Sequence, residues 1–361
     1  MIRHWLARAG WCAILLVMIT PQRLTPSAQD TPTDAPGQTL SISALPRLDP
    51  PPTIVDFLSG FGMAAEAGVT GDFLSKPWSE IEPATGEYVL QDTFNYLSYV
   101  NNAYDYTLMI GIQVLNTTAK ETPADLLDVP FDDPRMIGAF EALFDQLLPA
   151  LTENVRYLSI GNEVDVYLTA HPEEWDAYKT FFDATAAYVR EWAPWIEVGV
   201  TVTFDGMQTE ADKVVRLTET ADVAIVTYYP FKAGLQVKEP SAALIDFPQI
   251  VALADGRPVI LQEVGYPSAE ILGSSEAMQA EFVRYAFEAW AVEGEAIPFF
   301  NYFVLHDFTE QMCSDFETYY GFPNERFHAM LCSLGLRQAD GTPKAAWDVF
   351  VEEAQRWTGH D

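Results

Sequence analysis

Two glutamates, each placed at the end of a short apolar run, are the residues of this sequence best suited to chemistry. Glu163 ends the run in Y-L-S-I-G-N-E-V-D, and Glu263 ends the run in P-V-I-L-Q-E-V-G-Y-P-S. Short apolar runs of this kind are typical of strands buried on both faces. Two carboxyls at such strand ends can share one reaction, in which one donates a proton and the other attacks or stabilises an electron-poor carbon. The pattern predicts an enzyme that cleaves glycosidic bonds.

Eight segments have the composition of the buried strands needed to position these residues. They are continuously apolar or rich in β-branched residues, as expected for parallel strands covered by helices. Glu163 follows the fourth segment and Glu263 ends the seventh. The predicted strands are residues 39–45, 69–74, 107–114, 157–162, 197–203, 223–228, 258–263 and 298–304.

The segments between these strands have helical periodicity. From Ile54 onward apolar residues recur at three- and four-residue spacing, with Thr53 and Asp56 placed as a capping box and Gly68 as a stop. Similar patterns follow the fourth and seventh strands, and the last predicted helix spans residues 345–354. Eight strand–helix units predict a single (β/α)8 TIM barrel, whose functional residues lie at the carboxyl ends of the strands.

Residues 1–28 have the features of a secretory signal peptide. Arg3 and Arg8 supply positive charge, and residues 11–19 form an apolar stretch too short to span a bilayer comfortably. Small or turn-forming residues suited to cleavage follow. We therefore expect a secreted protein without stable membrane insertion.

Residues 29–37 are rich in Pro, Thr and Asp and lack an apolar period, which predicts a disordered linker. The folded glycoside hydrolase domain is then predicted over residues 38–361. A barrel of alternating strands and helices commonly uses 250 residues or more as one unit, so the length is consistent with a single domain.

The composition favours a neutral ligand. The 361 residues are 49% hydrophobic and 20% charged, and the formal net charge is -32. Repulsion between like charges disfavours nucleic acid, anionic lipid and acidic polysaccharides as partners. Solubility is the alternative explanation of the acidity.

Cysteine and histidine usage predicts no metal cofactor. Cys12 lies in the predicted signal peptide, which leaves Cys313 and Cys332 in the mature chain. In an oxidising compartment these two could form a disulfide, and the alternative is a pair of buried thiols. The sequence contains no C-x-x-C and no Cys/His cluster of the kind that binds zinc.

Four further motifs, spread over nearly the whole mature chain, carry a family resemblance. E-V-G-Y-P-S at residues 263–268 is close to a motif of family 17 glucanases, and T-Y-Y-P at residues 227–230 resembles the sixth-strand motif of family 53 galactanases. Residues 77–88 and 340–350 resemble the segment after strand two and the final turn and helix. The sequence is therefore similar to clan A of retaining (β/α)8 glycoside hydrolases, which includes these families and the family 42 β-galactosidases.

The resemblance implies roles for three residues. Glu163, preceded by Asn162, corresponds to the acid/base that ends the fourth strand, and Glu263 corresponds to the nucleophile that ends the seventh. Asn162 is expected to hydrogen-bond the sugar 2-hydroxyl. The implied reaction is double displacement at β-linked bonds of a neutral polysaccharide or oligosaccharide, with galactans or glucans preferred. We expect a monomer that needs no cofactor.

Two aromatic residues are predicted to support this site. Tyr228, at the end of the sixth strand, is expected to hydrogen-bond Glu263 and hold it ionised, with Tyr229 as the neighbour that could be confused with it. Trp78 either bounds the cleft or has a structural role under the loop after strand two.

The sequence departs from the clan at two places. Strand two offers only Lys76 and Asp72 where relatives commonly carry an arginine, and strand eight lacks the usual tryptophan floor. Phe303 or Tyr302 is expected to supply that floor, because any aromatic ring can cover the apolar face of a sugar.

Other classes of protein are less consistent with the sequence. A metal-dependent barrel would need clustered His and carboxylate ligands, and a phosphate-binding barrel would need glycine-rich loops after strands seven and eight. A non-catalytic glycan-binding barrel remains the alternative, since it could keep the cleft and the aromatic residues. Retention of both glutamates argues against it.

Overall fold

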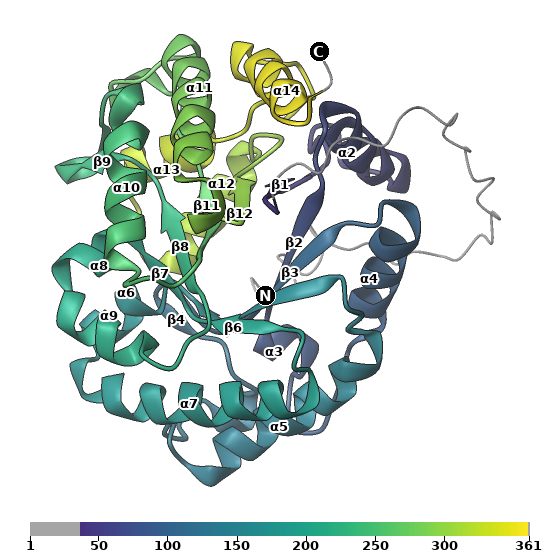
Figure 1. The fold of residues 1–361 in the computed structure, drawn as a ribbon, viewed down its shortest axis with the longest axis vertical. Coiled ribbons are helices and arrows are strands. Elements are labelled where there is room, and N and C mark those ends of the chain that lie inside the picture. Colours follow the sequence, from purple (N-terminus) through teal and green to yellow (C-terminus); the bar gives the residue numbers. More distant parts are fainter. Residues whose placement is uncertain (1–36, 360–361) are drawn as a thin grey trace.

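The computed structural model describes residues 37–359, which form a closed barrel of parallel strands surrounded by helices (Figure 1). Strands β6 and β7 are consecutive parts of one barrel strand; β6 pairs with β5 and β7 pairs with β8, so the ring closes. The predicted (β/α)8 barrel and its eight strands are confirmed. In chain order the barrel strands are β1 (Thr39–Ile42), β2 (Gly71–Pro77), β3 (Thr107–Asn116), β5 (Val155–Asn162), β6 (Glu197–Gly199) with β7 (Thr201–Thr203), β8 (Ala224–Tyr228), β11 (Val259–Val264) and β12 (Phe299–Tyr302).

The helices form an outer ring, as Figure 1 shows, because each has an apolar face that packs on the strands. The longer ring helices are α2 (Ile54–Ala67), α4 (Gln91–Ala103), α5 (Pro134–Leu147), α7 (Trp175–Trp192), α9 (Ala211–Thr218), α10 (Ala243–Leu253), α11 (Glu276–Glu293) and α14 (Ala345–Trp357). Shorter elements at the strand ends are α3 (Trp78–Ile81), β4 (Ala119–Lys120), α6 (Val164–Ala170), α8 (Phe204–Thr209), β9 (Phe231–Lys232) and β10 (Gln236–Val237).

Helix α2 begins and ends at the residues that the sequence predicts. The Thr53 backbone N–H donates to the Asp56 carboxylate over 2.7 Å, which completes the capping box. Gly68 ends the helix with φ 101°, a left-handed conformation that favours glycine.

The lower part of the barrel interior is apolar. We call this set the apolar layer; its side chains contact one another across the barrel and are separate from the larger core between strands and helices. Its members are Phe73, Met109, Tyr157, Val223, Ile225, Ile260 and Phe299.

Directly above, towards the carboxyl ends of the strands, the interior becomes polar. We call this set the polar layer; it comprises the buried residues Ser41, Ser159, Thr201, Gln262 and Asn301. Ser41 donates to the Asn301 side-chain oxygen over 2.7 Å, Thr201 donates to the Gln262 side-chain oxygen over 2.6 Å, and the Ser159 and Thr201 hydroxyls share a hydrogen bond of 2.6 Å. These bonds satisfy polar groups that would be costly to bury alone.

A helical hairpin of α12 (Glu310–Tyr320) and α13 (Glu325–Leu331) follows strand β12. Cys313 and Cys332 form a disulfide that links the two helices, so this alternative of the two predicted for the cysteines is confirmed. Within residues 37–359 these cysteines and His328 are close enough together to hold a metal, but the two sulfurs are bonded to each other.

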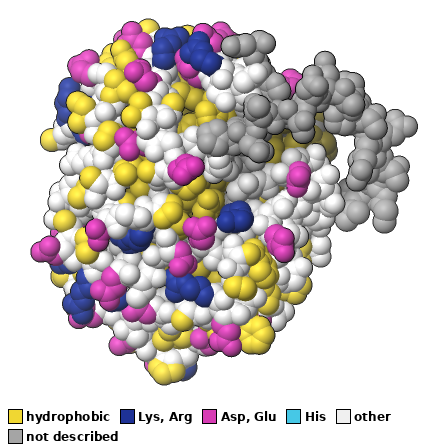
Figure 2. Space-filling model, viewed as in Figure 1, with side chains coloured by type: hydrophobic (Ala, Val, Ile, Leu, Met, Phe, Trp, Pro, Cys, Tyr) yellow, Lys and Arg dark blue, Asp and Glu magenta, His cyan; other side chains and the backbone are white. Residues whose placement is uncertain are grey.

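The predicted signal peptide and residues 29–36 of the predicted linker lie outside the described residues. Over residues 37–359, no helix combines the length and the apolarity needed to cross a bilayer. On the face shown in Figure 2, acidic side chains are scattered among hydrophobic and basic ones instead of forming one patch.

Candidate active site

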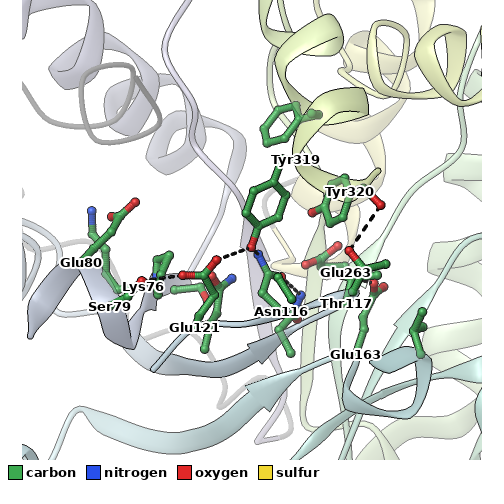
Figure 3. A pocket seen from close by; sticks show the side chains of 18 of the residues that line it. Lys76, Ser79, Glu80, Asn116, Thr117, Glu121, Glu163, Glu263, Tyr319 and Tyr320 are labelled. Atoms are coloured by element: carbon green, nitrogen blue, oxygen red, sulfur yellow. Dashed lines mark hydrogen bonds between the residues drawn. The ribbon is translucent and has the colours of Figure 1, made fainter. Parts of the chain in front are cut away.

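A cavity of about 1230 Å³ opens at the carboxyl ends of the barrel strands, and both predicted glutamates line it (Figure 3). Its wall comes from strand ends, from the turn between β3 and β4, and from the α12–α13 hairpin. The lining includes Asn116, Thr117, Asn162, Glu163, Tyr229, Glu263, Phe303, Tyr319 and Tyr320.

Glu163 is carried into the cavity by a turn at the end of β5. Gly161 has φ 98° and Glu163 has φ 46°, so the chain leaves the strand through two left-handed residues before α6 begins. A side chain at position 161 would place its Cβ 2.3 Å from the Tyr178 hydroxyl, which explains the glycine. The acidic residue itself has a backbone conformation that is uncommon for residues other than glycine.

Both carboxylate oxygens of Glu163 have hydroxyl partners. Thr227 donates to Oε1 and Thr117 donates to Oε2, each over 2.8 Å. Burial raises the pKa of Glu163, and these two hydrogen bonds oppose the rise. The carboxyl is therefore held in one orientation and is easier to protonate than a carboxyl in water.

Glu263 lies near the end of β11, where the pairing with β8 shifts register between Leu261 and Glu263. The Tyr229 hydroxyl donates to Glu263 Oε2 over 2.6 Å. Burial raises the pKa of Glu263, and the charge of Glu163 raises it further. Because each carboxylate disfavours ionisation of the other, the pair favours a state that holds one proton and one negative charge.

The structure corrects the prediction for Tyr228. Its side chain is fully buried and donates to Asp246 over 2.8 Å, whereas Tyr229 bonds Glu263. Side chains alternate along a strand, so Ile225, Thr227 and Tyr229 face the barrel interior and Tyr228 faces the helices. The alternation was readable from the sequence.

Asn162 lines the cavity beside Glu163, and its side-chain amide is held by two neighbours. Gln262 of the polar layer donates to its oxygen over 2.7 Å, and its nitrogen donates to the Asn116 side-chain oxygen over 3.0 Å. The amide nitrogen keeps one further hydrogen for a ligand. The predicted contact with a sugar hydroxyl stays a prediction.

Trp78 does not line the cavity, so the prediction that it bounds the cleft is wrong and its structural alternative holds. The indole is fully buried, donates to Glu82 over 2.7 Å and packs against Phe140 and Phe181. Helix α3 starts at this residue, and the ring packs between α3 and the helices α5 and α7.

Phe303 lines the cavity, with its ring edge-on to Tyr229 at 6.4 Å between centroids. Tyr302 is fully buried against Phe350 of α14. Of the two residues considered for an aromatic floor, Phe303 alone lies on the cavity, and its role towards a sugar stays a prediction.

Sequence reasoning missed the contributions of loops and of the hairpin. Thr117 follows β3 and Tyr320 ends α12, and neither position has a strand or helix period that would direct it to the cavity. Tyr320 lines the cavity beside Glu263 (Figure 3), and burial and the charges of Glu163 and Glu263 raise its pKa. Thr227 could have been found, because it lies within the T-Y-Y-P motif on the inward side of β8.

Comparison with known proteins shows the fold. No protein-family model matches the sequence, and a search of curated proteins found no match. A GH5_18 variant from Streptomyces cattleya in complex with Manb1-4GlcNAc aligns with a TM-score of 0.70 and 17% identity over 89% of this chain and 81% of its own. The exo-beta-1,4-mannosidase Op5Man5 from Opitutaceae bacterium strain TAV5 aligns with a TM-score of 0.68 and 18% identity, over 90% of this chain and 60% of its own.

The GH53 catalytic domain of Ignisphaera aggregans also has this fold, with a TM-score of 0.56 and 15% identity over 87% of this chain and 91% of its own. The family 53 resemblance carried by the sequence motifs is thus accompanied by a similar fold. At these identities the likeness concerns the barrel architecture, and the chemistry has to be argued from the site.

Proposed function

We propose that this protein is a retaining β-glycoside hydrolase with Glu163 as acid/base and Glu263 as nucleophile. The observation that carries the proposal is that two carboxyls, from the ends of the fourth and seventh barrel strands, line one cavity. Such a pair is what double displacement at an anomeric carbon requires.

The reaction follows from the state with one proton on the pair. Glu163 donates its proton to the glycosidic oxygen as the bond from that oxygen to the anomeric carbon breaks, and a Glu263 oxygen bonds to the same carbon from the opposite face. Water then attacks this carbon, gives a proton to Glu163 and releases Glu263 as a carboxylate. The two glutamates end the cycle as they began it.

The hydrogen-bond partners support this division of roles. Burial and the charge of Glu263 raise the pKa of Tyr229 well above its ordinary value, so the phenol stays protonated and donates to Glu263. That bond favours the ionised form of the nucleophile. The partners of Glu163 are the hydroxyls of Thr117 and Thr227, which can donate to a carboxylate or accept from a carboxylic acid.

The substrate we propose is a neutral β-linked saccharide, with β-mannosides tested before galactans and glucans. The cavity contains further carboxylates, Glu80 and Glu121, which disfavour anionic sugars. Mannosides take precedence because the similar structures include a Manb1-4GlcNAc complex and a protein described as an exo-beta-1,4-mannosidase. Export through the predicted signal peptide is part of the proposal, and the disulfide is consistent with an oxidising compartment.

The test is hydrolysis of a panel of neutral β-glycosides and β-glycans, with the anomeric configuration of the product followed by NMR during the reaction. The wild type should release product of retained configuration. Glu263→Gln should lower kcat by about 10⁴-fold or more while leaving saccharide affinity largely intact. Inverted product would reject the covalent mechanism.

The matched control is Glu270→Gln, an exposed glutamate seven residues further along the chain, which should keep full turnover. The alternative function, a glycan-binding barrel without turnover, is supported if the wild type binds the panel but hydrolyses none of it. Unchanged turnover in Glu263→Gln would reject the assignment of the nucleophile.

A further inference from the structure

Tyr319 stands inside the cavity between two groups of polar side chains (Figure 3). On one side lie Glu163 and Glu263 with Tyr320. On the other side lies a second group, which we call the side chamber and which comes from the end of β2, from α3 and from the residue after β4. The side chamber comprises Lys76, Ser79, Glu80 and Glu121.

The hydroxyl group of Tyr319 is held by two hydrogen bonds to side chains that line the cavity. It donates to Glu121 Oε1 over 2.9 Å and accepts from the Asn116 side-chain nitrogen over 2.9 Å. Glu121 also accepts from Ser79, and Asn116 accepts from Asn162. Glu121 therefore links Tyr319 to the side chamber, and Asn116 links it to Asn162, the residue before Glu163.

The backbone end of Tyr319 is anchored as well. The disulfide between Cys313 and Cys332 ties α12 to α13, and His328 of α13 lies 2.9 Å from both Glu310 and Glu317 of α12. Because the backbone of Tyr319 is held in this way, its side chain can change rotamer only by breaking both hydrogen bonds of its hydroxyl.

We propose that Tyr319 narrows the saccharide-binding cavity between the catalytic pair and the side chamber, so that the protein takes the end of a glycan chain instead of an internal segment. A chain that continued past the catalytic pair towards the side chamber would have to pass the Tyr319 ring, which stands between the two groups. This inference rests on the proposed function and specifies where in the glycan chain it acts.

The experiment compares viscosity loss with the release of reducing ends. The polysaccharide is the one that the wild type degrades in the panel, beginning with soluble β-1,4-glucomannan. Cleavage at chain ends releases reducing ends with little loss of viscosity, whereas internal cleavage lowers viscosity early. The wild type should show the first pattern. Tyr319→Ala, which opens the passage to the side chamber, should lose at least about tenfold more viscosity per reducing end formed.

Two variants serve as controls. Tyr319→Phe keeps the ring and its backbone position but loses both hydroxyl bonds, so its change in viscosity per reducing end should be smaller than that of Tyr319→Ala. Thr318→Ala alters an exposed neighbour on the same helix and should behave as the wild type. Hydrolysis of the 4-nitrophenyl β-glycoside of the same sugar shows that each variant is folded, and Tyr319→Val replaces the alanine variant if the latter fails this check.

The outcomes separate the two proposals. Early viscosity loss by the wild type, or a chain-end pattern that survives removal of the ring, would overturn the role of Tyr319 and leave the hydrolase proposal standing. If the wild type hydrolyses neither the aryl glycosides nor the glycans of the panel, the hydrolase proposal itself fails.

Discussion

The apolar layer and the polar layer lie one above the other in the barrel, and on three strands their members are only two positions apart. On β11, Ile260 belongs to the apolar layer and Gln262 to the polar layer; on β12, Phe299 and Asn301 follow the same order. Side chains two residues apart on a strand point in the same direction, about 7 Å apart. Along β5, β11 and β12 the interior thus changes from apolar contacts to hydrogen bonds within two positions of the chain.

The difference separates two requirements of the molecule. Apolar contacts stabilise the barrel in proportion to the area buried, and they do not require one particular orientation. Hydrogen bonds add little net stability, but they fix the direction of each group. The polar layer ends at Gln262, which bonds Asn162 beside Glu163. We infer that stability comes mainly from the lower layer and alignment of the site mainly from the upper one.

The largest expected effect is on stability, from a cavity in the apolar layer. Phe299 is fully buried and packs edge-on against Tyr157 at 5.7 Å between centroids. Phe299→Ala should lower the free energy of unfolding by about 3–5 kcal/mol, measured by denaturant titration. The kcat of the folded fraction should stay close to that of the wild type. A large loss of kcat with little loss of stability would contradict the separation of the two layers.

A smaller loss of stability with a larger loss of rate is expected in the polar layer. Gln262→Leu removes the donor to Asn162 and the acceptor of Thr201, and each unpaired group costs about 1–3 kcal/mol. The rate should fall because Asn162 is no longer held and because the bond from Gln262 that lowers the pKa of Glu263 is lost. Steady-state kinetics and thermal unfolding of the same preparation measure both effects.

The matched control for that variant is Gln279→Leu, a buried glutamine on α11 that donates to backbone carbonyls, including that of Tyr266. It should lose stability to a similar degree and keep kcat. Equal losses of kcat in the two glutamine variants would show that the polar layer has no special part in alignment.

The smallest expected effect is a shift in the pH profile of kcat/KM, caused by a substitution at Tyr229, whose hydroxyl bonds Glu263. The Tyr229 hydrogen bond lowers the pKa of Glu263, so Tyr229→Phe should raise that pKa. Since Glu263 must be ionised to attack, the acidic limb of the kcat/KM profile should move to higher pH. The loss of rate at neutral pH should be about tenfold, as expected for the loss of one hydrogen bond to a charged group. Tyr228→Phe, which loses only the bond to Asp246, should leave the acidic limb in place.

The fold and the two acidic residues could be predicted because both depend on local pattern. Parallel strands covered by helices are continuously apolar, and a carboxyl at the end of such a strand is conspicuous. Tyr229 was within reach, because strand alternation places it on the side of Ile225 and Thr227. The sequence did not decide between the two roles of Trp78, because an aromatic residue after a strand gives no sign of which way the next turn points.

Thr117 and Tyr319 could not have been found in this way. Thr117 has φ 51°, outside any regular strand or helix, and its bond to Glu163 depends on a turn that only the assembled barrel defines. Tyr319 reaches Asn116 across 203 positions of sequence. Such contacts depend on how the α12–α13 hairpin packs on the ends of the barrel strands, and the spacing of residues within either segment does not predict them.

The hairpin that carries Tyr319 has a disulfide that spans 19 positions, and its two ends lie side by side, since Asp307 and Arg337 are joined by a backbone hydrogen bond. Such a segment could vary as a unit, because its internal crosslink belongs to it and its Tyr319 meets the barrel through the side chains of Asn116 and Glu121. Changes confined to the α12–α13 hairpin could therefore alter substrate preference while the barrel, Glu163 and Glu263 stay the same.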